Sequence, residues 1–104
     1  MKRPEIVNRL REIIHAIAPD AKVILYGSEA RGDARPESDI DLLILLNKEK
    51  VTYSDQIQLS GPLYDLELSS GVLISPMIIS RKSWENRPFK TPFFVNVMNE
   101  GILL

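Results

Sequence analysis

The sequence predicts an α/β domain in which a small mixed sheet of three or four strands packs against helices. Two short apolar runs, Val23–Tyr26 and Leu42–Leu46, have the length and the side chains of buried strands. A third apolar run, Val72–Ser80, follows a long segment with helical spacing. The chain has 104 residues, so we expect one domain spanning residues 1–104.

The first predicted element is an amphipathic helix over residues 4–18. Pro4 suits a first helical position, and Pro19 closes the segment. Apolar side chains recur between them at the spacing of one helix face, at Ile6, Leu10, Ile13, Ile14 and Ile17. We expect this helix to pack on one face of the sheet.

A sharp turn and a very short helix should follow the strand at Val23–Tyr26. Gly27 permits the turn, Ser28 is a good N-cap, and Gly32 can end a helix formed by Glu29–Arg31. The first turn of a helix has backbone N–H groups without helical partners and a partial positive charge. These groups and the Ser28 hydroxyl have the character of a phosphate site.

Two aspartates stand where the second strand begins. Residues two apart in a strand point to the same face, so the Asp39 and Asp41 carboxylates should project together. Adjacent carboxylates repel each other unless a cation lies between them, and their hard oxygens suit Mg²⁺ held together with phosphates. The stretch therefore predicts a magnesium site beside a phosphate site.

The second half of the chain should add a helical segment and a third strand. Lys48–Ser70 has helical spacing, but Gly61-Pro62 predicts a kink or a break into two shorter helices. Gly71 should end this segment. Pro76 lacks a backbone donor, so the strand Val72–Ser80 should be an edge strand or contain a bulge.

The C-terminal third is predicted to be helical around polar connections. A short helix at residues 82–85 contains Trp84, which more often covers the edge of a core than stacks on a nucleobase. Thr91-Pro92 resembles a helix start, and much of residues 91–104 should be helical. The chain closes with three apolar residues, Ile102–Leu104, which suit an interface or simple packing onto the domain.

Composition excludes several classes of protein. Thirteen basic and fourteen acidic residues give a formal net charge of −1, which disfavours binding to a nucleic-acid backbone. There is no cysteine, so disulfides and thiolate metal sites are excluded. The N-terminus lacks the continuous apolar core of a signal peptide, and no run reaches membrane-spanning length. By elimination we expect a cytoplasmic protein.

The stretch from Val23 to Leu46 resembles the DNA polymerase β-like nucleotidyltransferase superfamily, and specifically its minimal nucleotidyltransferase (MNT) branch. Gly27-Ser28 is followed by ten residues and then by Asp39-Ile40-Asp41, which matches the family pattern. Ala30-Arg31-Gly32 and Ser38 match it as well. The resemblance implies the polymerase β-like fold and the Mg²⁺-dependent transfer of a nucleoside monophosphate from an NTP, such as ATP, to a hydroxyl.

The resemblance also implies roles for individual residues and a partner. Asp39 and Asp41 would be catalytic and would bind Mg²⁺, while Gly27, Ser28 and Arg31 would bind the triphosphate. Arg35 is the alternative to Arg31, and solvent exposure with pairing to a nearby acid is the plainer interpretation of both. The branch includes MntA-type antitoxins, some of which add AMP to a HEPN-domain ribonuclease toxin. A HEPN-type toxin is therefore the implied protein partner.

The chain departs from this family on the third strand. Related enzymes commonly carry a third carboxylate there, whereas this chain has Ser75, which cannot act as a carboxylate base. Glu67 or a partner's carboxylate is a possible substitute. The alternative function is a binding module, weakly active or inactive, that neutralises a partner by forming a complex through its apolar C-terminus. A transferase acting on a small molecule is a weaker third possibility.

Overall fold

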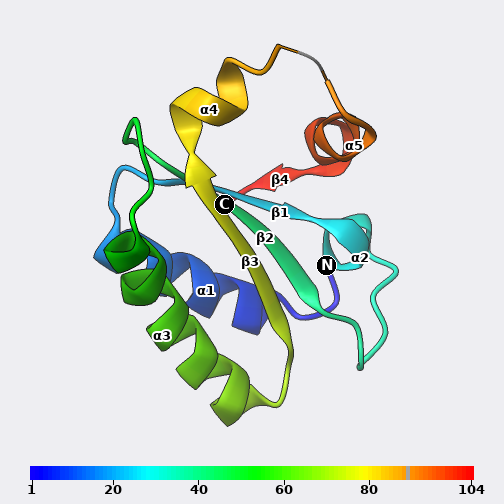
Figure 1. Ribbon diagram of the computed structural model, residues 1–104. Coiled ribbons are helices and arrows are strands. Elements are labelled where there is room, and N and C mark those ends of the chain that lie inside the picture. Colours follow the sequence, from blue (N-terminus) through cyan, green and yellow to red (C-terminus); the bar gives the residue numbers. More distant parts are fainter. Residues whose placement is uncertain (89) are drawn as a thin grey trace.

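The structure is a computed structural model that describes residues 1–88 and 90–104, and its centre is a four-stranded mixed sheet (Figure 1). The strands are β1 (Lys22–Tyr26), β2 (Ile40–Leu46), β3 (Ile74–Ser80) and β4 (Ile102–Leu103), in the spatial order β3-β2-β1-β4. β2 runs parallel to β3 and antiparallel to β1, and β4 pairs antiparallel with β1. The predicted mixed sheet is confirmed, and β3 is an edge strand as Pro76 indicated.

Two long helices, α1 (Pro4–Ile17) and α3 (Tyr53–Ser70), cover one face of the sheet (Figure 1). Alternate residues of the strands point into this layer, and the main core forms there. Its most buried members include Leu10, Ile14, Leu25, Ile40, Leu42, Ile44, Leu59 and Leu63. The predicted N-terminal helix is therefore confirmed. Leu10 and Ile14 of its predicted apolar face are buried, but Ile17 is exposed and Val7 is buried in addition.

The other face of the sheet is covered in part by α4 (Arg81–Glu85) and α5 (Pro92–Glu100). Trp84 is 2% exposed and belongs to a second core cluster with Leu43 and Val97. The Trp84 ring lies 4.6 Å from the Phe94 ring, centroid to centroid. Trp84 thus covers the edge of a core, the interpretation that the sequence favoured over stacking on a nucleobase.

Of the kink or break expected at Gly61-Pro62, the break into two helices was wrong, because α3 is one continuous helix of 18 residues. Thr52 and Asp55 form a capping box that begins the helix well, and Gly71 ends it in a left-handed conformation. Leu59 and Leu63, one on each side of the break point, are both buried. Burial on both sides of the proline holds the helix together despite the backbone hydrogen bond that Pro62 cannot donate.

The expectation of a mainly helical C-terminus holds only as far as Glu100. Gly101 ends α5, and the apolar residues after it pair with β1 as the short edge strand β4. The Leu104 N–H donates to the Val23 carbonyl at 2.8 Å. Of the two interpretations of these apolar residues, packing onto the domain is the one the structure supports, although Leu103 is exposed.

Within the described residues, no helix is both long and apolar enough to cross a membrane.

Candidate active site

The two aspartates lie at the start of β2, on the sheet face opposite α1 and α3. Asp39 directly precedes the strand, and Asp41 lies inside it between the buried residues Ile40 and Leu42. Burial and the nearby Asp39 charge raise the pKa of the Asp41 carboxyl. The nearby Arg31 charge opposes this rise only in part. The predicted pairing of the two carboxylates is therefore present, together with the repulsion between them.

Ser75 lies beside both aspartates. It faces Asp41 in the parallel register between β2 and β3, and its hydroxyl donates to Asp39 Oδ2 at 2.9 Å. Ser75 thus stands where the family resemblance places a third carboxylate. Glu67 does not fill that role, because it lies on α3, on the other face of the sheet, where its carboxylate accepts the Ile74 N–H at 2.9 Å.

The turn after β1 brings the predicted phosphate-binding residues to the same end of the sheet. Gly27 begins the five-residue helix α2 (Gly27–Arg31) with φ +76°, a conformation that favours glycine. A Cβ at Gly27 would overlap Asp41 Oδ2, so the missing side chain is what allows the carboxylate to lie there. The prediction that Ser28 is the N-cap of this helix was wrong. Because the helix begins at Gly27, Ser28 lies in its first turn and Tyr26 takes the cap position.

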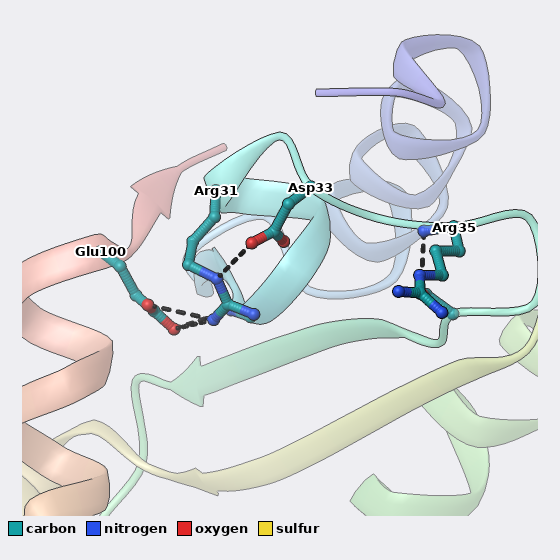
Figure 2. A network of polar contacts seen from close by, with 6 residues as sticks. Arg31, Asp33, Arg35 and Glu100 are labelled. Carbon is teal, nitrogen blue, oxygen red and sulfur yellow. Dashed lines mark hydrogen bonds and ion pairs between the residues drawn. The ribbon is translucent and has the colours of Figure 1, made fainter.

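Glu100, at the end of α5, is a member of this site that sequence reasoning missed (Figure 2). Its carboxylate accepts the Gly27 N–H at 3.1 Å and pairs with Arg31 Nη1, which lies 3.2 Å from each carboxylate oxygen. Arg31 also pairs with Asp33 at 3.3 Å, as the plainer interpretation of this arginine expected. Arg35 lies at the far end of the loop in Figure 2, away from this cluster. No short-range signal identifies Glu100, which is 73 residues from Gly27.

A buried ion pair holds α2 in place. The Glu29 side chain is fully buried and accepts Arg3 Nε at 2.7 Å and the Arg3 backbone N–H at 2.8 Å. Burial by itself would raise the pKa of Glu29, but the hydrogen bonds from Arg3 and from the Lys2 N–H outweigh it and lower that pKa. The N-terminus of the chain is thereby tied to the helix that carries Ser28 and Arg31.

The described residues offer two carboxylates for a cation at this site. No group of three or more His, Cys, Asp or Glu side chains among them is arranged to hold a metal ion. Asp39 and Asp41 are hard oxygen donors whose mutual repulsion a divalent cation would relieve. Such a donor pair fits Mg²⁺ that takes its remaining ligands from a triphosphate and water.

Comparisons with known proteins agree with this geometry. The nucleotidyltransferase domain model matches residues 7–96. A relative from Methanocaldococcus jannaschii named "Putative protein adenylyltransferase MJ0141" is 36% identical over 100 residues, which cover 94% of each chain. The solved "Structure of putative minimal nucleotidyltransferase" is 28% identical, with a TM-score of 0.62, and the match covers 97% of this chain and 94% of that one.

A further similar structure is the "Crystal structure of the toxin-antitoxin with AMP-PNP". Its TM-score is 0.65 at 18% identity, and the match covers 92% of this chain and 69% of that one. The fold and the paired carboxylates define a nucleotidyltransferase. The chain belongs to the nucleotidyltransferase domain family, as the Gly-Ser and Asp-x-Asp spacing predicted. The roles of the individual site residues stay predictions.

The raised pKa of Asp41 gives a prediction about stability. The folded chain binds the Asp41 proton more tightly than the unfolded chain, so ionised Asp41 destabilises the fold, fully so at neutral pH. We expect Asp41→Asn to raise the midpoint of thermal unfolding at pH 7, with a gain that shrinks as the pH falls through the carboxyl range. Differential scanning calorimetry from pH 7 to pH 4 measures this. Asp65→Asn, at an exposed position on α3, is the control, and a lower midpoint for Asp41→Asn at pH 7 would contradict the account.

Proposed function

We propose that this chain is a Mg²⁺-dependent adenylyltransferase that transfers AMP from ATP to a hydroxyl group of a partner protein. One observation carries the proposal: Asp39 and Asp41 lie beside the Gly27-Ser28 turn at one end of the sheet. The similarity to a relative named as a protein adenylyltransferase, over 94% of both chains, supports the choice of nucleotide and acceptor.

In this proposal Asp39 and Asp41 would be the protein ligands of Mg²⁺. When bound, the ion neutralises charge on the phosphate oxygens and makes the α-phosphorus a better electrophile. Ser75 supports the arrangement from β3, because its hydroxyl fixes one oxygen of Asp39, and no other hydrogen bond to this carboxylate is made within the described residues. Ser75 is therefore a positioning residue, and its presence gives the site one negative charge fewer than a site with three carboxylates.

The triphosphate lies across the start of α2. The Ser28 hydroxyl and the backbone N–H groups of the first turn bind its β- and γ-phosphates, and Arg31 pairs with their oxygens. A hydroxyl oxygen of the acceptor attacks the α-phosphorus in line and loses its proton to water. The bond from the α-phosphorus to the oxygen bridging to the β-phosphate breaks, and pyrophosphate leaves. The chain's own contribution is to position the two reactants and to balance their charge.

The proposed acceptor is a HEPN-type ribonuclease toxin, and this chain is its antitoxin. A structure with the same fold is described as a toxin-antitoxin with AMP-PNP, which supports both a protein partner and an adenine nucleotide. The chain's net charge of −1 offers little attraction to a nucleic-acid acceptor. A toxin of this kind acts in the cytoplasm, so we place this chain there as well.

Co-expression with the protein encoded by the neighbouring gene tests the proposal. We expect the intact mass of that protein to increase by one or more AMP groups with the wild-type chain. With Asp39→Asn/Asp41→Asn the increase should disappear, because the cation loses both charged ligands. Circular dichroism of the double variant should match the wild type, since neither side chain belongs to the core.

The same experiment separates the two candidate functions. A stable complex without any mass increase favours the binding module that Ser75 leaves open. An unmodified partner together with no complex contradicts the protein acceptor, and a modified partner with the double variant contradicts the assignment of the aspartates.

The Glu100 carboxylate already accepts hydrogen bonds from two of the groups that are proposed to bind the triphosphate. The Gly27 N–H and the Arg31 guanidinium both bond to its carboxylate, so a triphosphate must replace that carboxylate before it can bind them. The backbone at this point is held by β4, which pairs with β1, so the Glu100 side chain is the part that can rotate away. Glu100 therefore competes with the substrate for Arg31.

We expect Glu100→Gln to lower the KM for MgATP, because the amide has no charge with which to pair Arg31. The expected decrease is about twofold to threefold, because an ion pair in a partly exposed site is weak. Steady-state AMP transfer measures it. Glu85→Gln, which removes an exposed glutamate paired with an arginine away from this site, is the control. A higher KM, or a large loss of kcat, would show that Glu100 is required for the reaction rather than in competition with the substrate.

A further inference from the structure

Helix α3 carries an apolar stripe on its outer face that the proposed function does not use. The α3 stripe consists of Tyr53, Ile57, Gly61, Tyr64 and Leu68. At 3.6 residues per turn these five positions fall within an arc of about 80°. Their large side chains are among the most exposed apolar ones of the described residues: Tyr53 80%, Leu68 66%, Tyr64 58% and Ile57 52%.

This stripe is additional to the face that α3 uses to join the core. Leu59 and Leu63 point inward and are buried, so the helix presents apolar residues on two sides. A helix that only covers a sheet needs one apolar face and is polar on the other. Contiguous apolar side chains on the outside of a soluble domain indicate a contact with another protein surface.

We propose that the α3 stripe packs against the same stripe of a second copy of this chain, with the two helices antiparallel. The stripe is symmetric about a point between Ser60 and Gly61. In an antiparallel pair centred there, Tyr53 of each copy meets Leu68 of the other, and Ile57 meets Tyr64. Each contact joins one tyrosine to one aliphatic side chain, which is the self-complementarity that a two-fold interface requires.

The centre of the stripe allows two helices to approach closely. Gly61 has no other atom within 4 Å of the position where a Cβ would stand, so it faces open space. Ser60, on the other side of the symmetry point, is also small and exposed. Small residues at a crossing point let the larger side chains on either side interlock.

The charges of α3 favour the antiparallel arrangement. The helix has no lysine or arginine, and the acidic residues beside the stripe, Asp65 and Glu67, are both in its C-terminal half. In the antiparallel pair they lie across from the uncharged Ser54, Gln56 and Gln58 of the other copy. A parallel pair would bring the acidic residues of the two copies together, and like charges there are destabilising.

The proposed dimer leaves the candidate active site open, because α3 covers the opposite face of the sheet. It is also independent of the proposed function, since it is measured as a molecular mass and not as an activity. One pair of helices makes a small interface, so we expect a weak dimer that forms as the protein concentration rises.

Cysteine cross-linking tests the symmetry point directly, because the natural chain contains no cysteine. We expect Ser60→Cys to form a disulfide-linked dimer under mild oxidation. The control is Ser69→Cys, an exposed position on the same helix but off the α3 stripe, which should stay monomeric. Equal cross-linking of the two variants would overturn the proposal.

Sedimentation velocity over a concentration series gives the second test. The wild type should shift from the monomer mass of 11.8 kDa towards twice that mass, and Ile57→Glu should remain a monomer. Met98→Glu, at an exposed apolar position on α5, introduces the same charge away from the stripe and should dimerise like the wild type. A wild-type chain that stays monomeric at every concentration would overturn the proposal and would indicate that the α3 stripe contacts a different protein.

Discussion

The arrangement of this molecule depends on holding two carboxylates side by side at the start of a fully buried strand. β2 lies between β3 and β1, and its residues from Leu42 to Leu46 are all buried. This burial fixes the strand and so keeps the Asp41 carboxylate close to that of Asp39. Burial first and the Asp39 charge second raise the pKa of Asp41, and a bound cation would offset the repulsion between the two carboxylates.

Long-range contacts bring the other parts of the site to these carboxylates. The Glu29–Arg3 pair ties α2 to the N-terminus, and removing one partner of such a buried pair costs about 3–5 kcal/mol. Aromatic contacts of Phe93 with Tyr26 and Trp84 hold α5 against the sheet. Through α5 the fold brings Glu100 to Gly27 and Arg31, so the C-terminus contributes to a site whose other members come from the first three quarters of the chain.

The sequence predicted those features that depend on local pattern. The spacing from Gly27-Ser28 to Asp39 and Asp41 indicated both the site and the family, and apolar runs located three of the four strands. The break predicted at Pro62 does not occur, because burial of side chains on both sides of it outweighs one missing hydrogen bond. β4 and the role of Glu100 could not be predicted from the sequence. Both depend on contacts with distant parts of the chain, which no local pattern indicates.

A crystal structure with a non-hydrolysable ATP analogue and Mn²⁺, whose anomalous scattering locates the ion, tests whether the two aspartates form a cation site. We expect a Mn²⁺ peak between the Asp39 and Asp41 carboxylates, with the triphosphate along the first turn of α2. We also expect that the Glu100 side chain has rotated away from Gly27 and Arg31. A nucleotide or ion bound elsewhere, with the two aspartates unligated, would contradict the account.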